Sequence, residues 1–145
     1  MKKINIIVTF FIASLMVLSC STDFNNVNSD HTDVIGFSSP DKRIPVSENS
    51  PEITVSINFF VSNMSSSERT FNLTVVEEET ELLEATYSFD AFVVVPANER
   101  SGSLMFTALN DSSLTNDFQP MVIAFEGTSE ISSGNSITVE IKTND

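Results

Sequence analysis

Residues 52–60 read EITVSINFF, and their apolar side chains recur at every second position. The apolar positions are Ile53, Val55, Ile57 and Phe59, with polar side chains between them. Because successive side chains of a β-strand point to opposite faces, this segment predicts a strand with one buried face. Phe59 and Phe60 are neighbours and point to opposite faces, so one of the two rings is expected outside the main core.

The same alternation returns along the rest of the chain, and turn residues such as Asn, Asp, Pro and Ser separate the runs. The further runs are VIGFS (34–38), RIPVS (43–47), TFNLTVV (70–76), FDAFVVVP (89–96), SLMFTAL (103–109), PMVIAF (120–125) and SITVEIK (136–142). No stretch after residue 33 shows a helical period. The pattern predicts an all-β domain over residues 34–145: a single immunoglobulin-like antiparallel β-sandwich of about seven strands.

Length and charge limit the possible partners. The chain has 145 residues, which suits one domain, and it carries 20 Asp and Glu against 7 Lys and Arg, a formal net charge of −13. Nucleic acids and anionic head groups repel such a surface, since their binding depends on Lys and Arg that neutralise phosphates. We therefore expect no nucleic-acid partner.

The first 19 residues have the pattern of a secretory signal peptide. Lys2 and Lys3 form a basic start, and residues 4–18 are apolar apart from Asn5, Thr9 and Ser14. A permanent membrane helix needs about 20 apolar residues, so this stretch is short for that role. We expect residues 1–19 to be removed, and this signal peptide to precede the sandwich.

The segment Val17-Leu18-Ser19-Cys20 resembles the bacterial lipobox, with an aliphatic residue, a small residue and then cysteine. The resemblance implies that Cys20, the only cysteine, is lipidated and becomes the first residue of the mature chain. Several acyl chains anchor a protein stably, whereas one binds only marginally. Residues 20–33 then form a lipidated cysteine with a flexible tether. Ser21 stands where some inner-membrane lipoproteins have Asp, which favours the outer membrane, with the domain facing either the periplasm or the cell surface.

From Phe37 to Lys142, the segments FSSPDKRIPVSEN, ITVSINF, RTFNLTV and VVVPANERSGSLMFTAL, followed by MVIAFEG and SITVEIK, resemble the Calx-beta family. Its members are immunoglobulin-like sandwiches, and some bind calcium at one end through clustered carboxylates. The resemblance implies Glu48 and Asp111 as calcium ligands. The family's acidic loop carries several more acids, whereas residues 112–118 offer only Asp117. Since Ca²⁺ takes six to eight oxygens, Glu48, Asp111 and Asp117 form a sparse set.

Exposed aromatic rings are the usual stacking surfaces for sugars, and this chain has no Trp and a single Tyr, Tyr87. A glycan site would therefore use phenylalanines, and the candidates are Phe60, Phe89, Phe92 and Phe118. The acidic run from Glu77 to Glu84 predicts a solvated hairpin that deters strand-edge pairing.

Catalysis has little support. The single histidine, His31, falls in the expected tether, and Cys20 is expected to carry lipid, so serine and cysteine nucleophiles lack a fixed base. No zinc-ligand set or Gly-rich phosphate loop occurs. We expect a protein that is not an enzyme: an envelope lipoprotein whose sandwich is a binding or structural module with an envelope protein partner. The alternatives are a calcium-dependent adhesion module and a surface lipoprotein that captures glycans.

Overall fold

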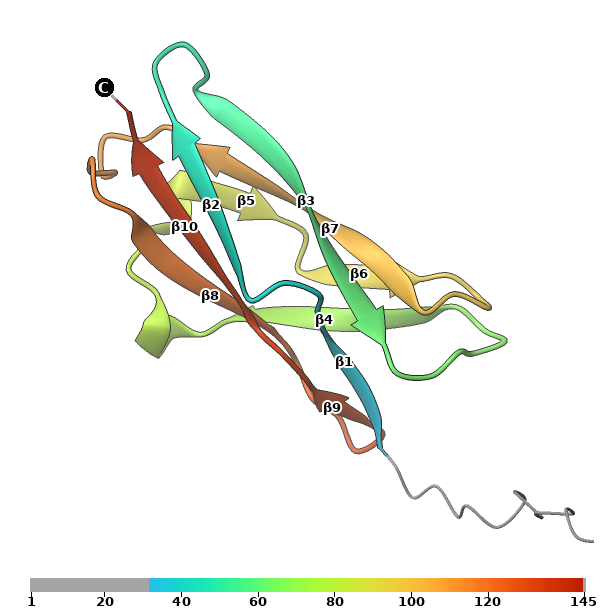
Figure 1. The fold of residues 1–145 in the computed structure, drawn as a ribbon. Coiled ribbons are helices and arrows are strands. Elements are labelled where there is room, and N and C mark those ends of the chain that lie inside the picture. Colours follow the sequence, from blue (N-terminus) through green and yellow to red (C-terminus); the bar gives the residue numbers. More distant parts are fainter. Residues whose placement is uncertain (1–31, 145) are drawn as a thin grey trace, which may run out of the picture. The chain divides into compact units, whose positions relative to one another are not determined.

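The computed structural model describes residues 32–144, and the expected signal peptide, Cys20, His31 and most of the expected tether lie outside this part of the chain. The described residues form strands joined by loops and two short 3₁₀ segments (Figure 1). The strands are β1 (Asp33–Phe37), β2 (Asp41–Val46), β3 (Glu52–Val61), β4 (Arg69–Val75), β5 (Tyr87–Phe89), β6 (Phe92–Val95), β7 (Ser101–Leu109), β8 (Gln119–Phe125), β9 (Ile131–Ser133) and β10 (Ile137–Thr143). The 3₁₀ segments are η3 (Glu77–Glu79) and η4 (Glu84–Thr86), both between β4 and β5.

The strands make two five-stranded sheets, and the prediction of an immunoglobulin-like sandwich is confirmed. The first sheet has the order β5-β7-β3-β1-β9 and the second has the order β2-β10-β8-β4-β6. Pairing is antiparallel as predicted, except that β1 pairs with β9 and β2 with β10 in parallel. No helix among residues 32–144 is long and apolar enough to cross a membrane.

Each connection between consecutive strands passes from one sheet to the other, and the three shortest all lead from the first sheet to the second. They join β1 to β2, β5 to β6, and β9 to β10. The first and third crossings lie against each other, because Phe37 N–H donates to Asn135 O at 2.9 Å. Glycines make this approach possible: a Cβ on Gly36 would lie 2.8 Å from Asn135 N, and one on Gly134 would lie 2.9 Å from Ile35 O. A side chain at either position would displace the facing backbone.

The middle crossing divides a segment that the sequence predicted as one strand. Residues 91–95 form a continuous apolar run soon after Phe89, yet β5 pairs with β7 in the first sheet and β6 pairs with β4 in the second. The crossing occurs at Asp90 and Ala91, outside both strands. Since both sheets face the same core, Phe89 of β5 and Val93 and Val95 of β6 all pack on it, while the neighbouring strand changes.

The core lies between the sheets and contains the predicted apolar faces. Phe59 is fully buried while Phe60 is 40% exposed, which confirms their opposite orientation. Phe125 of the second sheet packs against two rings of the first, with ring centroids 4.8 Å from Phe37 and 5.5 Å from Phe59. This aromatic cluster joins the sheets at the centre of the sandwich.

Candidate functional site

Two of the three predicted calcium ligands lie together at one end of the sandwich. Glu48 is in the turn between β2 and β3, closed by a hydrogen bond from Ser50 N–H to Ser47 O of 2.9 Å. Asp111 follows β7, in a loop tied to the β3 entrance because Asn110 N–H donates to Pro51 O. Glu48, Asn110, Asp111, Ser112, Leu114 and Thr143 line a cavity of about 180 Å³, here called the acidic cavity.

The acidic cavity brings two carboxylates together but not the third. Ser113 N–H donates to Asp111 Oδ1 at 2.9 Å, and this bond holds the pKa of Asp111 below its usual value. Asp117 is exposed in the same loop and does not line the cavity. Within residues 32–144, no group of three or more Asp, Glu, His or Cys side chains is placed to hold a metal ion.

The acidic cavity lies at the opposite end of β3 from the start of β1. At one end of β3, Glu52 pairs with Leu109, and at the other, Val61 pairs with Ile35. The chain therefore enters the domain at the Asp33 end, a full strand length from Glu48 and Asp111. Figure 1 shows this separation, with β1 beginning at the bottom and the β2–β3 turn at the top.

The four phenylalanines proposed for glycan binding do not share a surface. Phe89 stacks against Tyr87 and Phe106 at 5.9 Å from each and belongs to the core edge. Phe118 is partly buried beneath Arg43 and Lys142, with their charged groups 5.3 and 5.2 Å from its ring centroid. Phe60 and Phe92 remain accessible at 40% and 53% exposure, but they belong to different sheets.

Phe92 has polar neighbours that form a row across the outer face of the second sheet. It lies directly opposite Asn72 of β4 in the β4–β6 register. The Asn72 side-chain amide donates to Glu126 Oε2 at 3.2 Å, and Glu126 N–H donates to Asn72 O at 3.0 Å. We call Phe92, Asn72 and Glu126 the outer row. All three side chains are exposed.

A cavity of about 310 Å³ adjoins the outer row. It lies beside β4, at the point where β8 ends and its pairing with β4 stops. Its lining includes Asn72 and Glu126 from the row, Arg69 and Phe71 of β4, and Thr128 and Glu130 of the β8–β9 loop. Within residues 32–144, neither Asn72 Oδ1 nor Glu126 Oε1 accepts a hydrogen bond. The cavity therefore presents free acceptors beside an exposed ring, an arrangement that suits a hydroxyl-rich ligand.

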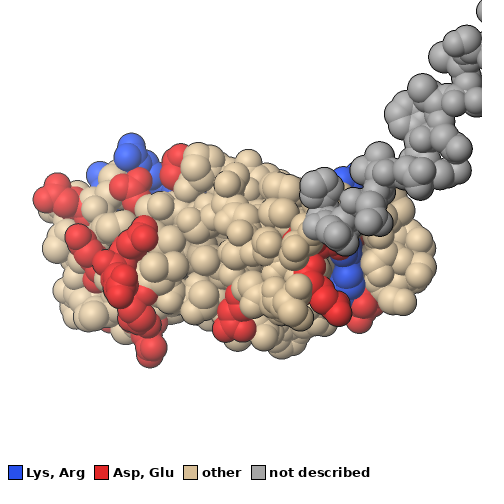
Figure 2. Space-filling view, turned by 90° about the horizontal axis from the view of Figure 1, so that it is seen from below, with Lys and Arg blue, Asp and Glu red and all other residues tan. Residues whose placement is uncertain are grey.

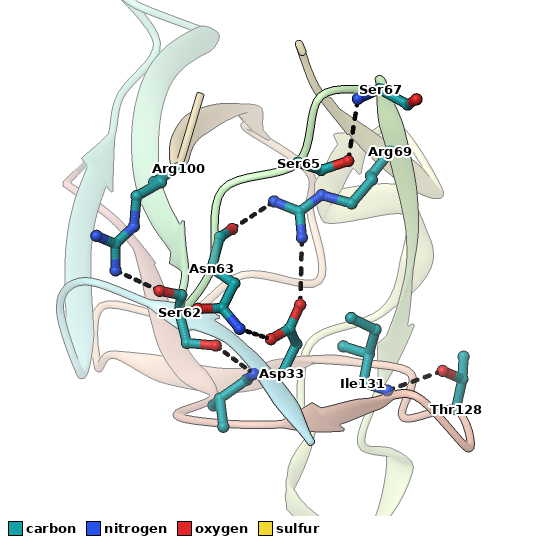
Figure 3. A network of polar contacts seen from close by, with 10 residues as sticks. Asp33, Ser62, Asn63, Ser65, Ser67, Arg69, Arg100, Thr128 and Ile131 are labelled. Carbon is teal, nitrogen blue, oxygen red and sulfur yellow. Dashed lines mark hydrogen bonds and ion pairs between the residues drawn. The ribbon is translucent and has the colours of Figure 1, made fainter. Parts of the chain in front are cut away.

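A polar network fixes one wall of this cavity (Figure 3). The Arg69 guanidinium donates to Asn63 O at 2.7 Å and pairs with the Asp33 carboxylate at 3.5 Å. The Asn63 side chain also donates to Asp33. In the loop opposite, Ile131 N–H donates to Thr128 Oγ1 at 3.1 Å. Arg69 is thereby held by the beginning of β1, and the wall is preorganised.

Sequence reasoning missed Asn72 and Glu126 as site residues. Asn72 occupies an ordinary outward position of the TFNLTVV run, and Glu126 follows the PMVIAF run. Their proximity to Phe92 depends on the registers of β4 with β6 and with β8, and no local pattern reports such a register.

No protein-family model matches the chain, and no curated protein matches it. Solved structures do resemble its fold. A "putative carbohydrate binding protein" from Bacteroides ovatus superimposes with a TM-score of 0.57 at 13% identity, over 74% of this chain and 36% of that one. The Apo-form Calx CBD1 domain has a TM-score of 0.56 at 14% identity, over 79% of this chain and 99% of that domain. The calcium binding domain CBD12 of CALX1.1 has a TM-score of 0.55 at 14% identity, over 77% of this chain and 44% of that one.

These structures establish a Calx-beta-like fold for the described residues. This chain spans about a third of the first protein and nearly all of the CBD1 domain. At 13–14% sequence identity, the similarity to these structures shows the fold alone.

Proposed function

We propose that this chain is a lipid-anchored binding module of the bacterial envelope, held at the outer membrane through lipid on Cys20, and that the outer row binds a glycan. The anchor is supported by the signal peptide and the lipobox-like segment at Val17–Cys20. The observation that carries the glycan assignment is the row itself, an exposed ring beside an amide and a carboxylate with free acceptors. No catalytic step is needed for this role.

Sugar recognition combines two interactions that the outer row offers. The apolar face of a pyranose ring stacks on an aromatic side chain, and its hydroxyls donate to and accept from amides and carboxylates. Phe92 supplies the first, and Asn72 with Glu126 supplies the second. The Bacteroides ovatus protein described as a "putative carbohydrate binding protein" shares this fold, which supports a glycan as the ligand class. A neutral glycan also suits a chain with an excess of acidic residues.

Replacing Phe92 with alanine is expected to weaken glycan binding about tenfold, because an aromatic stacking contact contributes about 1.5 kcal/mol. The mature chain, residues 20–145 with Cys20→Ser, would be applied to an array of neutral oligosaccharides. The affinity of the strongest ligand would then be measured by calorimetry.

Phe60→Ala is the matched control, since Phe60 is similarly exposed but lies on the other sheet. It should leave the affinity unchanged, whereas Asn72→Ala should weaken it. Equal losses for Phe60→Ala and Phe92→Ala would contradict the assignment, as would an array without any retained glycan.

Calcium binding at the acidic cavity is a second candidate function, favoured by one observation: Glu48 and Asp111 line the same cavity. The solved Calx domain CBD12 is described as calcium binding. With two carboxylates, we expect a weak site in the range of about 10⁻⁴–10⁻³ M that is typical of extracellular calcium modules. Such a site would support calcium-dependent adhesion.

Millimolar calcium is therefore expected to raise the melting temperature by a few degrees, because a ligand that binds only the folded state stabilises it. The mature chain would be melted in EDTA and in a calcium series, with magnesium as the comparison ion. Glu48→Gln and Asp111→Asn should abolish the rise. Asp117→Asn is the control and should retain it, since Asp117 lies outside the acidic cavity. A flat calcium series would exclude the site.

A further inference from the structure

One edge of β4 is paired along only part of its length. Its first residues pair with β6 in the register Arg69 with Val95 through Asn72 with Phe92. The pairing ends one residue later, where Leu73 N–H donates to Ala91 O at 2.8 Å. The chain segment that would continue it, β5, belongs to the first sheet and pairs with β7. The end of β4 on this side therefore has no neighbouring strand.

Val75 presents its backbone at this unpaired edge. In an antiparallel ladder, alternate residues point their N–H and C=O groups to opposite sides. Glu126 N–H donates to Asn72 O, and Val76 N–H donates to Val122 O, so the even-numbered residues face β8. Val75 consequently faces away from β8. Its N–H has no acceptor within residues 32–144, and its C=O accepts only a long bond of 3.4 Å from Thr74 Oγ1.

A groove of about 390 Å³ runs beside this edge. One wall is Leu73 and Val75 of β4, and the other is β5, with Glu84 also in the lining. The rings of Tyr87 and Phe89 stack 5.9 Å apart and continue onto buried Phe106. We call this space the β4–β5 groove. It combines an apolar aromatic wall with an open strand edge.

The surroundings of the groove are acidic. Between Arg69 and Arg100 the chain contains no Lys or Arg. The connection between β4 and β5, predicted as a solvated hairpin, instead contains η3 and η4, and its five glutamates are exposed: Glu77, Glu78, Glu79, Glu81 and Glu84. Figure 2 shows acidic side chains gathered at the end of the molecule where Figure 1 places η3.

The charge of this connection reaches the aromatic wall at Tyr87. Burial raises the pKa of Tyr87, and the negative charges of Glu84 and Glu77 raise the same pKa further. Glu84 lines the groove itself, and Glu77 begins η3 in the same connection between β4 and β5. A second copy of this chain, which is itself strongly acidic, would be repelled here, because like charges disfavour edge-to-edge pairing.

We propose that the β4–β5 groove binds an extended, basic segment of a partner protein, which adds its backbone to the edge of β4 at Val75. Strand addition to a sheet edge is a general mode of peptide recognition, in which backbone hydrogen bonds supply affinity and alternate side chains supply specificity. Apolar side chains of the segment pack on Tyr87 and Phe89, and its Lys or Arg side chains face Glu84 and Glu77. This surface is distinct from the outer row and from the acidic cavity.

Binding would be measured by fluorescence anisotropy with a labelled short peptide of alternating lysine and valine. The double variant Glu77→Gln, Glu84→Gln of the mature chain is expected to weaken binding about tenfold, from two exposed charge pairs. The matched control is Glu99→Gln, Glu130→Gln, which removes the same charge elsewhere and should weaken binding much less. If the two double variants lost the same affinity for the peptide, binding would depend on the overall charge of the chain, and the proposal would be overturned.

Pairing of the peptide backbone with Val75 can be measured separately by NMR. The Val75 amide signal should shift in ¹⁵N NMR spectra when the peptide is added, and its hydrogen exchange should slow. The same peptide with N-methylated valines, which lacks those backbone N–H groups, should bind much more weakly. The proposal would be overturned by an unmoved Val75 signal, by full affinity of the methylated peptide, or by an absence of peptide binding. Glycan binding by the outer row is measured in a separate experiment, so the result for one proposal does not decide the other.

Discussion

The substitution Phe125→Ala is expected to lower the free energy of unfolding by about 3–5 kcal/mol, the usual cost of removing a buried aromatic ring. Phe125 is 2% exposed and contacts Phe37 and Phe59 across the interface between the sheets. The cavity left behind cannot close without moving β8 or β1 and β3, so both lost burial and lost packing contribute. Since whole domains are stable by about 5–15 kcal/mol, the variant should lose a large part of its stability.

Urea unfolding of the mature chain, followed by circular dichroism, would measure this loss as a lower midpoint. Phe118→Ala is the comparison, because Phe118 is partly buried and its ring lies beneath two cations at the surface. We expect that variant to lose about 1 kcal/mol. Similar midpoints for the two variants would refute a central role for Phe125 in joining the sheets.

The substitution Cys20→Ser is expected to abolish lipidation completely, because hydroxyl oxygen does not replace the thiol that carries the lipid. The expectation follows from the lipobox-like segment alone, since Cys20 lies outside the described residues. Each buried CH₂ of an acyl chain contributes about 0.8 kcal/mol, so loss of all chains removes the membrane attachment.

Cells grown with an alkyne-labelled fatty acid would show whether the expressed chain carries label. We expect label on the native chain and none on Cys20→Ser, while Ser21→Ala, beside the cysteine, should retain it. An unlabelled native chain would refute the anchor and leave the binding proposals for residues 32–144 intact. Protease treatment of whole cells, compared with lysed cells, would then show which side of the membrane the domain faces.

The strands and their buried faces could be predicted from residue order because alternation is a local property. The EITVSINFF segment identifies its inward face, and Phe59 and Phe60 take opposite sides as expected. Locality also explains the error at residues 89–96. Apolar residues report contact with the core, and Phe89, Val93 and Val95 keep that contact when the chain passes from β5 in one sheet to β6 in the other.

The candidate sites depend on contacts between residues far apart in the chain. The family resemblance selected Glu48 and Asp111, and folding brings both to one cavity while leaving Asp117 outside it. Phe92 was a candidate from its residue type, but its partners Asn72 and Glu126 follow from two strand registers. The β4–β5 groove exists because β5 belongs to the other sheet and leaves the end of β4 without a neighbouring strand. Registers and sheet crossings are set by hydrogen bonds and packing between distant segments, so local sequence patterns do not contain them.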